Sequence, residues 1–331
     1  MSRRGWWLFA AMGLIWGVPY LLIKVAVGGV APPVLVLARV SIAAAILLPL
    51  AIRRRELAVL RPHWRWLAVF AVVEIIVPWL LLTEAETKLA SSLSGLLVAA
   101  VPIIVAVLAR FTGSKDRMSV IRWVGLLIGL GGVALLLGPG APHGETGQVF
   151  EVLGVAVCYA IGPLVASRKL SELPSLSMTA VCLAFAAVVY APLAAVTWPS
   201  AVPAAKVFWA IAGLAVVCTA VAFIGFFALI GEVGPARATV ITYVNPAVAV
   251  VLGALVLSER ITVAMVGAFA LILSGSVLAT RGGRRSEAAE ADAVIAEAAA
   301  VGAEQAVLAE QAVLAEQAVL AELADGGRAA G

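Results

Sequence analysis

Long apolar stretches separated by short polar turns follow one another from residue 6 to residue 280. An α-helix needs about 20 apolar residues to cross the hydrocarbon core of a bilayer, and these stretches have that length. The turns are short and often contain proline or glycine, as in Gly138-Pro139-Gly140. The pattern predicts ten membrane-spanning helices, at residues 6–27, 32–52, 64–83, 88–110, 119–137, 148–167, 176–197, 206–230, 235–257 and 261–280.

Two distant parts of the chain carry the same order of spans and turns. Pro102 lies in an apolar run that is followed by a charged turn with Asp116 and by a second apolar run. Downstream, Pro246 and Glu259 occupy the corresponding places at a nearly constant offset. We therefore predict an internal duplication; a single helical bundle with coincidental similarity is the alternative. The predicted repeats cover residues 1–140 and 141–281.

An odd number of spans in each repeat determines how the two repeats are related. With five predicted spans apiece, the second repeat must start from the opposite face of the membrane, so that the halves are inverted. The loops on one side hold most of the lysines and arginines, whereas the other side holds Lys24, Lys88, Lys206 and Arg260. The excess of positive charge predicts that both termini are cytoplasmic, in a multi-pass inner (plasma) membrane protein.

Composition agrees with this picture. The chain has 331 residues, of which 63% are hydrophobic and 13% charged, whereas a soluble domain carries about 25% charged residues. The mean hydropathy is +1.09. These values exclude a water-soluble fold and predict an all-α polytopic membrane protein. The net charge of +4 does not indicate nucleic-acid binding, because the basic residues form short clusters between apolar runs.

The sequence contains no pattern typical of an enzyme. Cys158, Cys182 and Cys218 stand singly inside predicted spans, without metal-ligand spacing. We find no phosphate-binding glycine loop and no nucleophile motif. We therefore predict no catalytic activity, cofactor or metal. Glycines inside the spans, such as Gly125 and Gly129, favour close helix packing, with a flexing point as the alternative.

Two charged residues lie well inside predicted spans, away from their ends, where an isolated charge is costly. Arg39 is in the second span and Glu74 is in the middle of the third. In one interpretation the two side chains form a neutralising pair. In the other, Glu74 is a titrating carboxylate that couples transport to protons, and Arg39 is a gate or an anion-binding group. Lys24, at the end of the first span, is expected to extend to the membrane surface.

Prolines and aromatic residues near the middle of several spans are candidates for a substrate pathway. A proline inside a span bends the helix and frees a backbone carbonyl, and corresponding bends in two repeats point to the central pathway. For each single aromatic residue, ordinary packing is an equal alternative. Together with Arg39 and Glu74, the pathway candidates are Trp16, Pro78, Trp79, Pro102, Tyr159, Tyr243, Asn245 and Pro246.

The last part of the chain, residues 282–331, differs from the rest. It is rich in alanine and glutamate and repeats EQAVLA three times. The composition favours helix, but a six-residue repeat places its Val-Leu pairs around all sides of a helix and gives no coiled-coil seam. We predict a solvated, partly helical cytoplasmic extension, with a partner-binding or regulatory tail as the alternative.

Up to the start of this tail, the chain resembles EamA-domain transporters of the drug/metabolite transporter superfamily. The resemblance rests on Trp16-Gly17, Arg39, Pro102 followed by Asp116-Arg117 and Gly125, and Pro246 followed by Ser258-Glu259-Arg260 and Gly267. Asp116 stands where the family usually has glutamate, and the second half lacks an arginine equivalent to Arg39. The resemblance implies a bacterial inner-membrane carrier with ten helices in inverted repeats, and many such carriers export amino acids or other metabolites.

The sequence thus predicts a secondary transporter that moves a small metabolite, an amino acid or related compound, by alternating access. Its predicted partners are a small-molecule substrate, membrane lipid and a proton or other coupling ion. Whether the protein forms a homo-oligomer stays open. The alternatives are a flippase for a lipid-linked substrate and a membrane scaffold that acts through its tail. Substrate, direction and coupling ion are not defined by the sequence.

Overall fold

Helices account for all regular structure in the part of the chain described by the computed structural model, which covers residues 2–111, 120–136, 146–234 and 238–280. The helices of the first half are α1 (Arg3–Ile15), α2 (Pro19–Ala26), α3 (Pro32–Arg53), α4 (Leu57–Leu60), η1 (Arg61–His63), α5 (Trp64–Ala71), η2 (Val72–Ile76), α6 (Val77–Lys88), α7 (Ser91–Val98), α8 (Val101–Phe111) and α9 (Val120–Leu136). Those of the second half are α10 (Thr146–Lys169), α11 (Ser175–Val196), α12 (Ala205–Ala212), η3 (Gly213–Val221), α13 (Ala222–Val233), η4 (Thr239–Tyr243), α15 (Asn245–Leu257) and α16 (Val263–Thr280). Residues 282–331, for which we predict a partly helical tail, lie outside the described residues.

Eight helical segments in this part of the chain are long and apolar enough to cross a membrane, and α9 and α16 are shorter apolar helices. Every predicted span corresponds to one of these segments. The third predicted span, residues 64–83, is wrong at its C-terminal end, because α6 continues to Lys88. It continues because Trp79, Thr83 and Glu86 lie on one helix face, and that face stays buried throughout.

Several of the long segments are interrupted near their middle. Between α1 and α2 the break precedes Pro19, and α8 begins just before Pro102. The short 3₁₀-helix η4 is followed by α15, with Pro246 in its first turn. Proline lacks the N–H that a continuous helix needs, which explains why the helical hydrogen bonding changes at these points.

Two other segments contain π-helix instead of a break. The segment η2 lies between α5 and α6, and η3 lies between α12 and α13. A side-chain hydroxyl bonds a backbone carbonyl of each π-helix. The buried Tyr190 of α11 donates to the Ile76 carbonyl, and Thr219 donates to the Leu214 carbonyl at 2.7 Å. These bonds satisfy carbonyls in a stretch where the regular ladder is altered.

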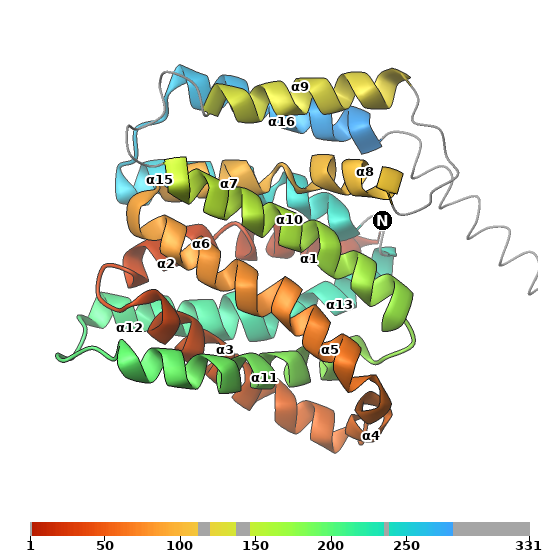
Figure 1. Cartoon of the computed structure of the whole chain (residues 1–331), viewed down its shortest axis with the longest axis vertical. Helices are drawn as coiled ribbons and strands as arrows, with labels where there is room; N and C mark the ends of the chain where they lie inside the picture. Colours follow the sequence, from red (N-terminus) through yellow and green to blue (C-terminus); the bar gives the residue numbers. More distant parts are fainter. Residues whose placement is uncertain (1, 112–119, 137–145, 235–237, 281–331) are drawn as a thin grey trace, which may run out of the picture. The chain divides into compact units, whose positions relative to one another are not determined.

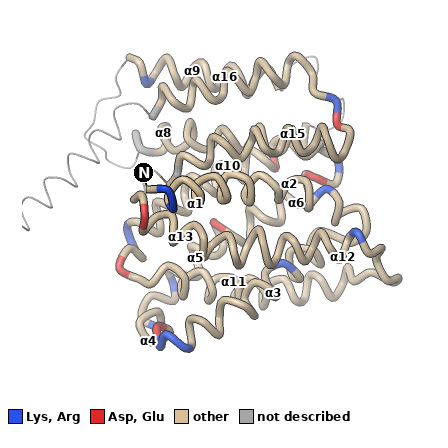
Figure 2. The backbone as a smooth tube through the Cα atoms, turned by 180° about the vertical axis from the view of Figure 1, so that it is seen from behind, with Lys and Arg blue, Asp and Glu red and all other residues tan. Residues whose placement is uncertain are grey.

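The segments pack side by side as a bundle (Figure 1), with α9 against α16, α3 against α11, α7 against α15 and α6 against α10. Charged residues gather near the helix ends, and few lie between them (Figure 2). An apolar middle between two polar ends suits a bilayer. Charged residues inside the spans, such as Arg39 and Glu74, are therefore exceptions to this pattern.

Glycines allow α9 and α16 to approach closely. A Cβ atom on Gly125 would lie 2.5 Å from the Ala279 backbone nitrogen and 2.8 Å from the Gly275 carbonyl oxygen. On Gly132, it would lie 2.9 Å from the Ala268 carbonyl oxygen. The packing role predicted for Gly125 is thus confirmed, since backbone atoms of α16 occupy the space of a side chain.

Gly125→Leu should therefore destabilise the fold. We expect the free energy of unfolding to fall by about 3 kcal/mol, because the obstructing atoms belong to backbone and cannot rotate away. Thermal unfolding of the purified protein in detergent measures this effect. The control is Gly131→Leu on the same helix, since no atom lies within 4 Å of its Cβ position. Equal losses in the two variants would contradict the packing role.

Candidate functional site

Arg39 is buried at the centre of the candidate site. Its side chain projects from α3 and is only 7% exposed. The Nε atom donates a hydrogen bond to the Thr219 hydroxyl in η3 at 2.9 Å. The guanidinium carbon lies 3.7 Å from the ring centroid of Trp79 in α6. Arg39 is therefore held by two membrane segments other than its own, through one hydrogen bond and one cation–π contact.

Two tyrosines complete this group. Tyr159 of α10 contacts the Trp79 side chain and lies within electrostatic range of both Arg39 and Glu74. Tyr20 of α2 is buried and lies within electrostatic range of Arg39 and Tyr159. We define the Arg39 cluster as Arg39, Trp79, Tyr159, Tyr20 and Thr219. Sequence analysis found the first three of these residues and missed the last two.

The neutralising Arg39–Glu74 pair does not form, so that interpretation is wrong for this structure. The partners of Arg39 are Thr219 and Trp79. Glu74 lies in η2, half-buried, with Oε2 buried and without a hydrogen-bond partner. Its carboxylate packs against Gly162 of α10, where a Cβ atom would collide with it. The π-helix changes the register between α5 and α6, which alters the direction in which Glu74 projects.

Residues around the breaks of α1–α2 and η4–α15 form a second group. Trp16 is half-buried. Its ring centroid lies 4.6 Å from that of Phe226 and 6.1 Å from that of Phe223, and both phenylalanines are in α13. Asn245 starts α15, and its amide nitrogen donates to the carbonyls of Ile241, at 3.0 Å, and Gly13, at 3.1 Å. This hydrogen bonding joins α1 to the start of α15. Trp16 therefore contacts α13 and not the Arg39 cluster.

The other predicted proline and tyrosine positions lie at the helix breaks. Pro78 is buried in the first turn of α6, directly beside Trp79. Pro246 is buried in the first turn of α15, and Tyr243 is the half-buried last residue of η4. Pro102 is half-buried in the first turn of α8. Pro78 thus adjoins the Arg39 cluster, whereas the other three residues lie at the breaks of other segments. The structure assigns none of the four a ligand.

Glu86 is a buried acid that sequence analysis missed. It is fully buried near the end of α6, and neither carboxylate oxygen has a hydrogen-bond partner. The predicted span ended at residue 83, which placed Glu86 in a loop. The available signal was the helical spacing of Trp79, Leu82, Thr83 and Glu86, all of which are buried.

Lys24 does not simply reach the surface as expected. It is half-buried, and Nζ donates to the main-chain carbonyls of Glu86, at 2.8 Å, and Leu89, at 2.7 Å. A lysine in this position satisfies carbonyls at the C-terminus of α6 and interacts favourably with the helix dipole.

Glu259, in the turn between α15 and α16, binds the first residues of α7. Its carboxylate accepts hydrogen bonds from the Ser91 backbone nitrogen at 2.7 Å, the Ser92 backbone nitrogen at 3.0 Å and the Ser92 hydroxyl at 2.6 Å. Partial burial opposes ionisation, but these hydrogen bonds outweigh it and hold the pKa of the Glu259 carboxyl below its usual range. Gly253 makes room for the carboxylate. The corresponding acid in the first half, Asp116, lies outside the described residues.

Glu259→Gln should weaken the hydrogen bonds that tie this side chain to the first residues of α7. Because the folded-state pKa is depressed, the stabilisation is present above the usual glutamate pKa of about 4.3 and is lost as the pH falls below it. We expect the variant to lose about 1 kcal/mol at neutral pH and to approach the wild type in stability at acidic pH. Thermal unfolding at both pH values measures the difference, with the exposed Glu172→Gln as control. A loss of equal size at both pH values would contradict the assignment.

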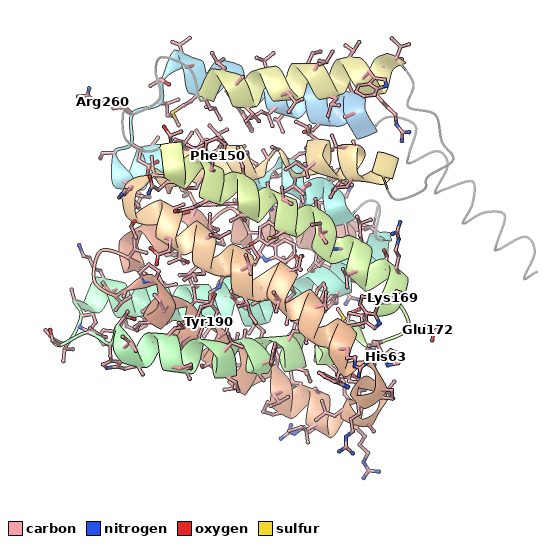
Figure 3. The ribbon with its side chains drawn as sticks, in the orientation of Figure 1. His63, Phe150, Lys169, Glu172, Tyr190 and Arg260 are labelled. Carbon is pink, nitrogen blue, oxygen red and sulfur yellow. The ribbon has the colours of Figure 1, made fainter. Side chains whose placement is uncertain are left out.

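Opposite ends of the bundle carry different charged residues. Figure 3 shows His63, Lys169 and Glu172 at one end and Arg260 at the other. The N-terminus lies at the end with His63 (Figure 1). The Arg39 cluster includes the buried side chains of Arg39, Trp79, Tyr20 and Thr219.

The sequence profile of the EamA-like transporter family matches residues 3–138 and again residues 148–281. The chain belongs to this family. It is therefore a membrane transporter, and the general function predicted from the sequence is confirmed.

Relatives over most of the chain are known as transporters. The Uncharacterized inner membrane transporter YedA of Escherichia coli (strain K12) is 30% identical over 276 residues, which cover 82% of this chain and 89% of the relative. The Uncharacterized transporter YvbV of Bacillus subtilis (strain 168) is 24% identical over 290 residues, covering 85% and 93%. A solved crystal structure of a protein at 23% identity superposes with a TM-score of 0.61 over 84% of this chain and 98% of that one, which supports the same fold.

A shorter match has a more specific name. The Probable 4-amino-4-deoxy-L-arabinose-phosphoundecaprenol flippase subunit ArnE of Pseudomonas fluorescens (strain Pf0-1) is 36% identical over 76 residues. This match covers 23% of the present chain and 63% of the relative.

Proposed function

We propose that this protein is a secondary carrier of the bacterial inner membrane that exports a small metabolite bearing an anionic group, such as an amino acid or a related compound. The observation that carries the proposal is Arg39, a buried arginine that forms no ion pair in the described part of the chain. A guanidinium that is fixed in place but not neutralised matches the geometry of a carboxylate.

The contacts of Arg39 suit a site that binds and releases its ligand. A hydroxyl and an aromatic face hold the guanidinium in position without cancelling its charge. A buried charge without a counterion is costly, and the cost is offset when an anionic substrate arrives. Tyr20 and Tyr159 flank the cluster and offer hydroxyl groups to the polar part of the substrate.

We further propose ten spans arranged as two inverted repeats, at residues 1–140 and 141–281. Corresponding segments share irregularities: the third and eighth contain π-helix, and the fourth and ninth are broken. The packing pairs are also related, since α3 lies against α11, α7 against α15 and α9 against α16. The two matches of the family profile fall within the two halves. Rocking of such halves would open the cluster to each side in turn.

Both termini would face the cytoplasm. The support is the excess of lysine and arginine in alternate loops. The end of the bundle with His63 and Lys169 would then be cytoplasmic, and the end with Arg260 would face outward. Fusion of reporter enzymes to the loops tests this orientation directly.

A comparison of metabolite pools tests the substrate assignment. Cells with and without the gene are grown alike, and compounds that accumulate inside cells lacking it are tested for transport by the purified protein in liposomes. We expect an anionic or zwitterionic metabolite, driven by an ion gradient without ATP. Flux that requires ATP, or flux only of compounds without an anionic group, would contradict the proposal.

A flippase for a lipid-linked substrate is the second candidate, favoured by the short match to a flippase subunit. Lipid-linked phosphates are also anionic, so Arg39 fits both candidates. Reconstitution distinguishes them: a flippase moves a labelled polyprenyl phosphate between leaflets, whereas a carrier moves a free solute.

A scaffold that acts through the tail is the third candidate. Deletion of residues 286–331 separates this role from transport, because a carrier should keep its transport rate and a scaffold should lose its partner. Loss of transport together with unchanged stability would count against the carrier as proposed.

A further inference from the structure

A buried carboxyl group without hydrogen-bond partners lies near the end of α6. Both carboxylate oxygens of Glu86 are buried without hydrogen-bond partners, and so is the hydroxyl oxygen of Ser94 in the next helix, α7. Glu86 itself is 0% exposed. Buried polar groups are normally satisfied, and a group of them without partners therefore points to a ligand or to a change of partners.

Lys24 is the nearest cation and is bound elsewhere. Its Nζ atom bonds the main-chain oxygens of Glu86 and Leu89, and no ion pair joins it to the Glu86 carboxylate within the described residues. Two carbonyl oxygens at a helix C-terminus would suit a metal cation. Because the lysine ammonium occupies both, the arrangement favours a proton over a metal ion as the ligand of Glu86.

The other charged and titratable groups around Glu86 form no ion pair with its carboxylate in the described part of the chain. Tyr20 of α2, Arg39 of α3 and Glu259 of the α15–α16 turn are within electrostatic range, besides Lys24. Glu151 of α10 interacts instead with Glu84 and Lys88 at the end of α6. An ionised carboxylate that is buried without a partner is strongly disfavoured. The arrangement thus corresponds to a Glu86 side chain that carries its proton.

We propose that Glu86 is a proton-binding site whose ionisation moves Lys24. When the Glu86 carboxyl group releases its proton to water, the carboxylate attracts the Lys24 ammonium, which leaves the carbonyl oxygens of Glu86 and Leu89. The C-terminus of α6 and the short link to α7 then lose the two hydrogen bonds that Lys24 of α2 donates to them. Only the further step, in which this movement helps drive alternating access, rests on the proposed function.

Infrared spectroscopy of the protein in lipid tests the protonation without any substrate. A protonated carboxylic acid has a C=O stretch that is absent from a carboxylate, so a pH titration follows each buried acid. We expect the wild type to show a titrating band that disappears in Glu86→Gln and persists in Glu84→Gln, in which the replaced acid is exposed on the same helix. Glu74→Gln identifies any band that belongs to Glu74.

Lys24→Met tests the exchange of partners. Removal of the positive charge disfavours the carboxylate, so the pH midpoint of the Glu86 band should rise by at least about one unit. Lys88→Met removes an exposed lysine of α6, the helix that carries Glu86, and should leave the midpoint of the Glu86 band unchanged. An unchanged midpoint in Lys24→Met would overturn the proposed exchange even if Glu86 carries a proton.

Two further results would overturn the proton site. One is a Glu86→Gln spectrum identical to the wild type at every pH. The other is a band whose midpoint depends on sodium concentration, which would indicate a metal cation as the competing ligand. If Glu86→Gln does not fold, Glu86→Asp and the Lys24→Met midpoint still decide the question. Since none of these measurements requires transport, their failure is distinct from failure of the carrier assignment.

Discussion

Arg39→Gln is expected to reduce the transport rate by about 100-fold while the protein still folds. Glutamine keeps a hydrogen-bonding group near Thr219, but it removes the positive charge that we assign to the anionic group of the substrate. Loss of one buried charge-assisted contact typically costs 2 to 5 kcal/mol, and about 100-fold corresponds to the lower part of that range. Initial rates of uptake into proteoliposomes measure the effect.

Two other variants make this experiment specific. Arg39→Lys keeps the charge but loses the planar guanidinium over Trp79, so we expect an intermediate loss. Arg53→Gln removes an exposed arginine at the end of the same helix and should leave the rate unchanged. If Arg39→Gln transports at the wild-type rate, the arginine has a structural role and the substrate site lies elsewhere.

Glu74→Gln is expected to flatten the pH profile of transport, leaving only the part that arises from Glu86. One carboxylate oxygen of Glu74 is buried without a partner, and the side chain lies in a π-helix against α10. Such a carboxyl group can bind and release a proton when the surrounding helices move, whereas glutamine cannot. Transport rates over a range of pH, in wild type and variant, test the prediction.

The matched control for Glu74 is Glu84→Gln, which replaces an exposed acid farther along the same membrane segment. It should keep the pH profile of the wild type. A Glu74→Gln variant that folds normally and keeps that profile would remove Glu74 as a coupling group. Glu86 and Glu151, which also have buried carboxylate oxygens without partners, would then remain as candidates.

The sequence identified the charged positions because charges inside apolar stretches are conspicuous. Arg39 and Glu74 were both found in this way. Their partners could not be found, since contacts depend on how each helix is rotated and on which distant segment faces it. Thr219 is 180 residues from Arg39 in the chain, and its role depends on the π-helix η3.

Apolar periodicity predicted where the helices lie more reliably than where they change. The spans near residues 32–52 and 176–197 agree closely with α3 and α11. The π-helices η2 and η3 were not predicted, because no proline lies within either segment and their composition resembles that of any apolar helix. Tyr190, which bonds a carbonyl of η2, comes from α11, whereas Thr219 bonds a carbonyl of its own π-helix.

Glu86 shows how a rule about charge can conceal a site. Charged residues usually mark the end of a span, and the predicted third span was therefore closed before the acidic stretch. The structure instead buries Glu86 on the face that carries Trp79, with Lys24 at the adjacent carbonyls. Helical spacing was the better guide here, because it reports which face is packed.

The most direct test of the carrier assignment is uptake by proteoliposomes that contain the purified protein, an imposed pH gradient and no ATP. The probes are carboxylate-bearing metabolites and matched analogues in which the carboxylate is replaced by an amide. We predict gradient-driven accumulation of at least one carboxylate, no accumulation of its amide, and loss of accumulation in Arg39→Gln. Equal accumulation of acid and amide, or the same accumulation in Arg39→Gln, would contradict a carrier built around this arginine.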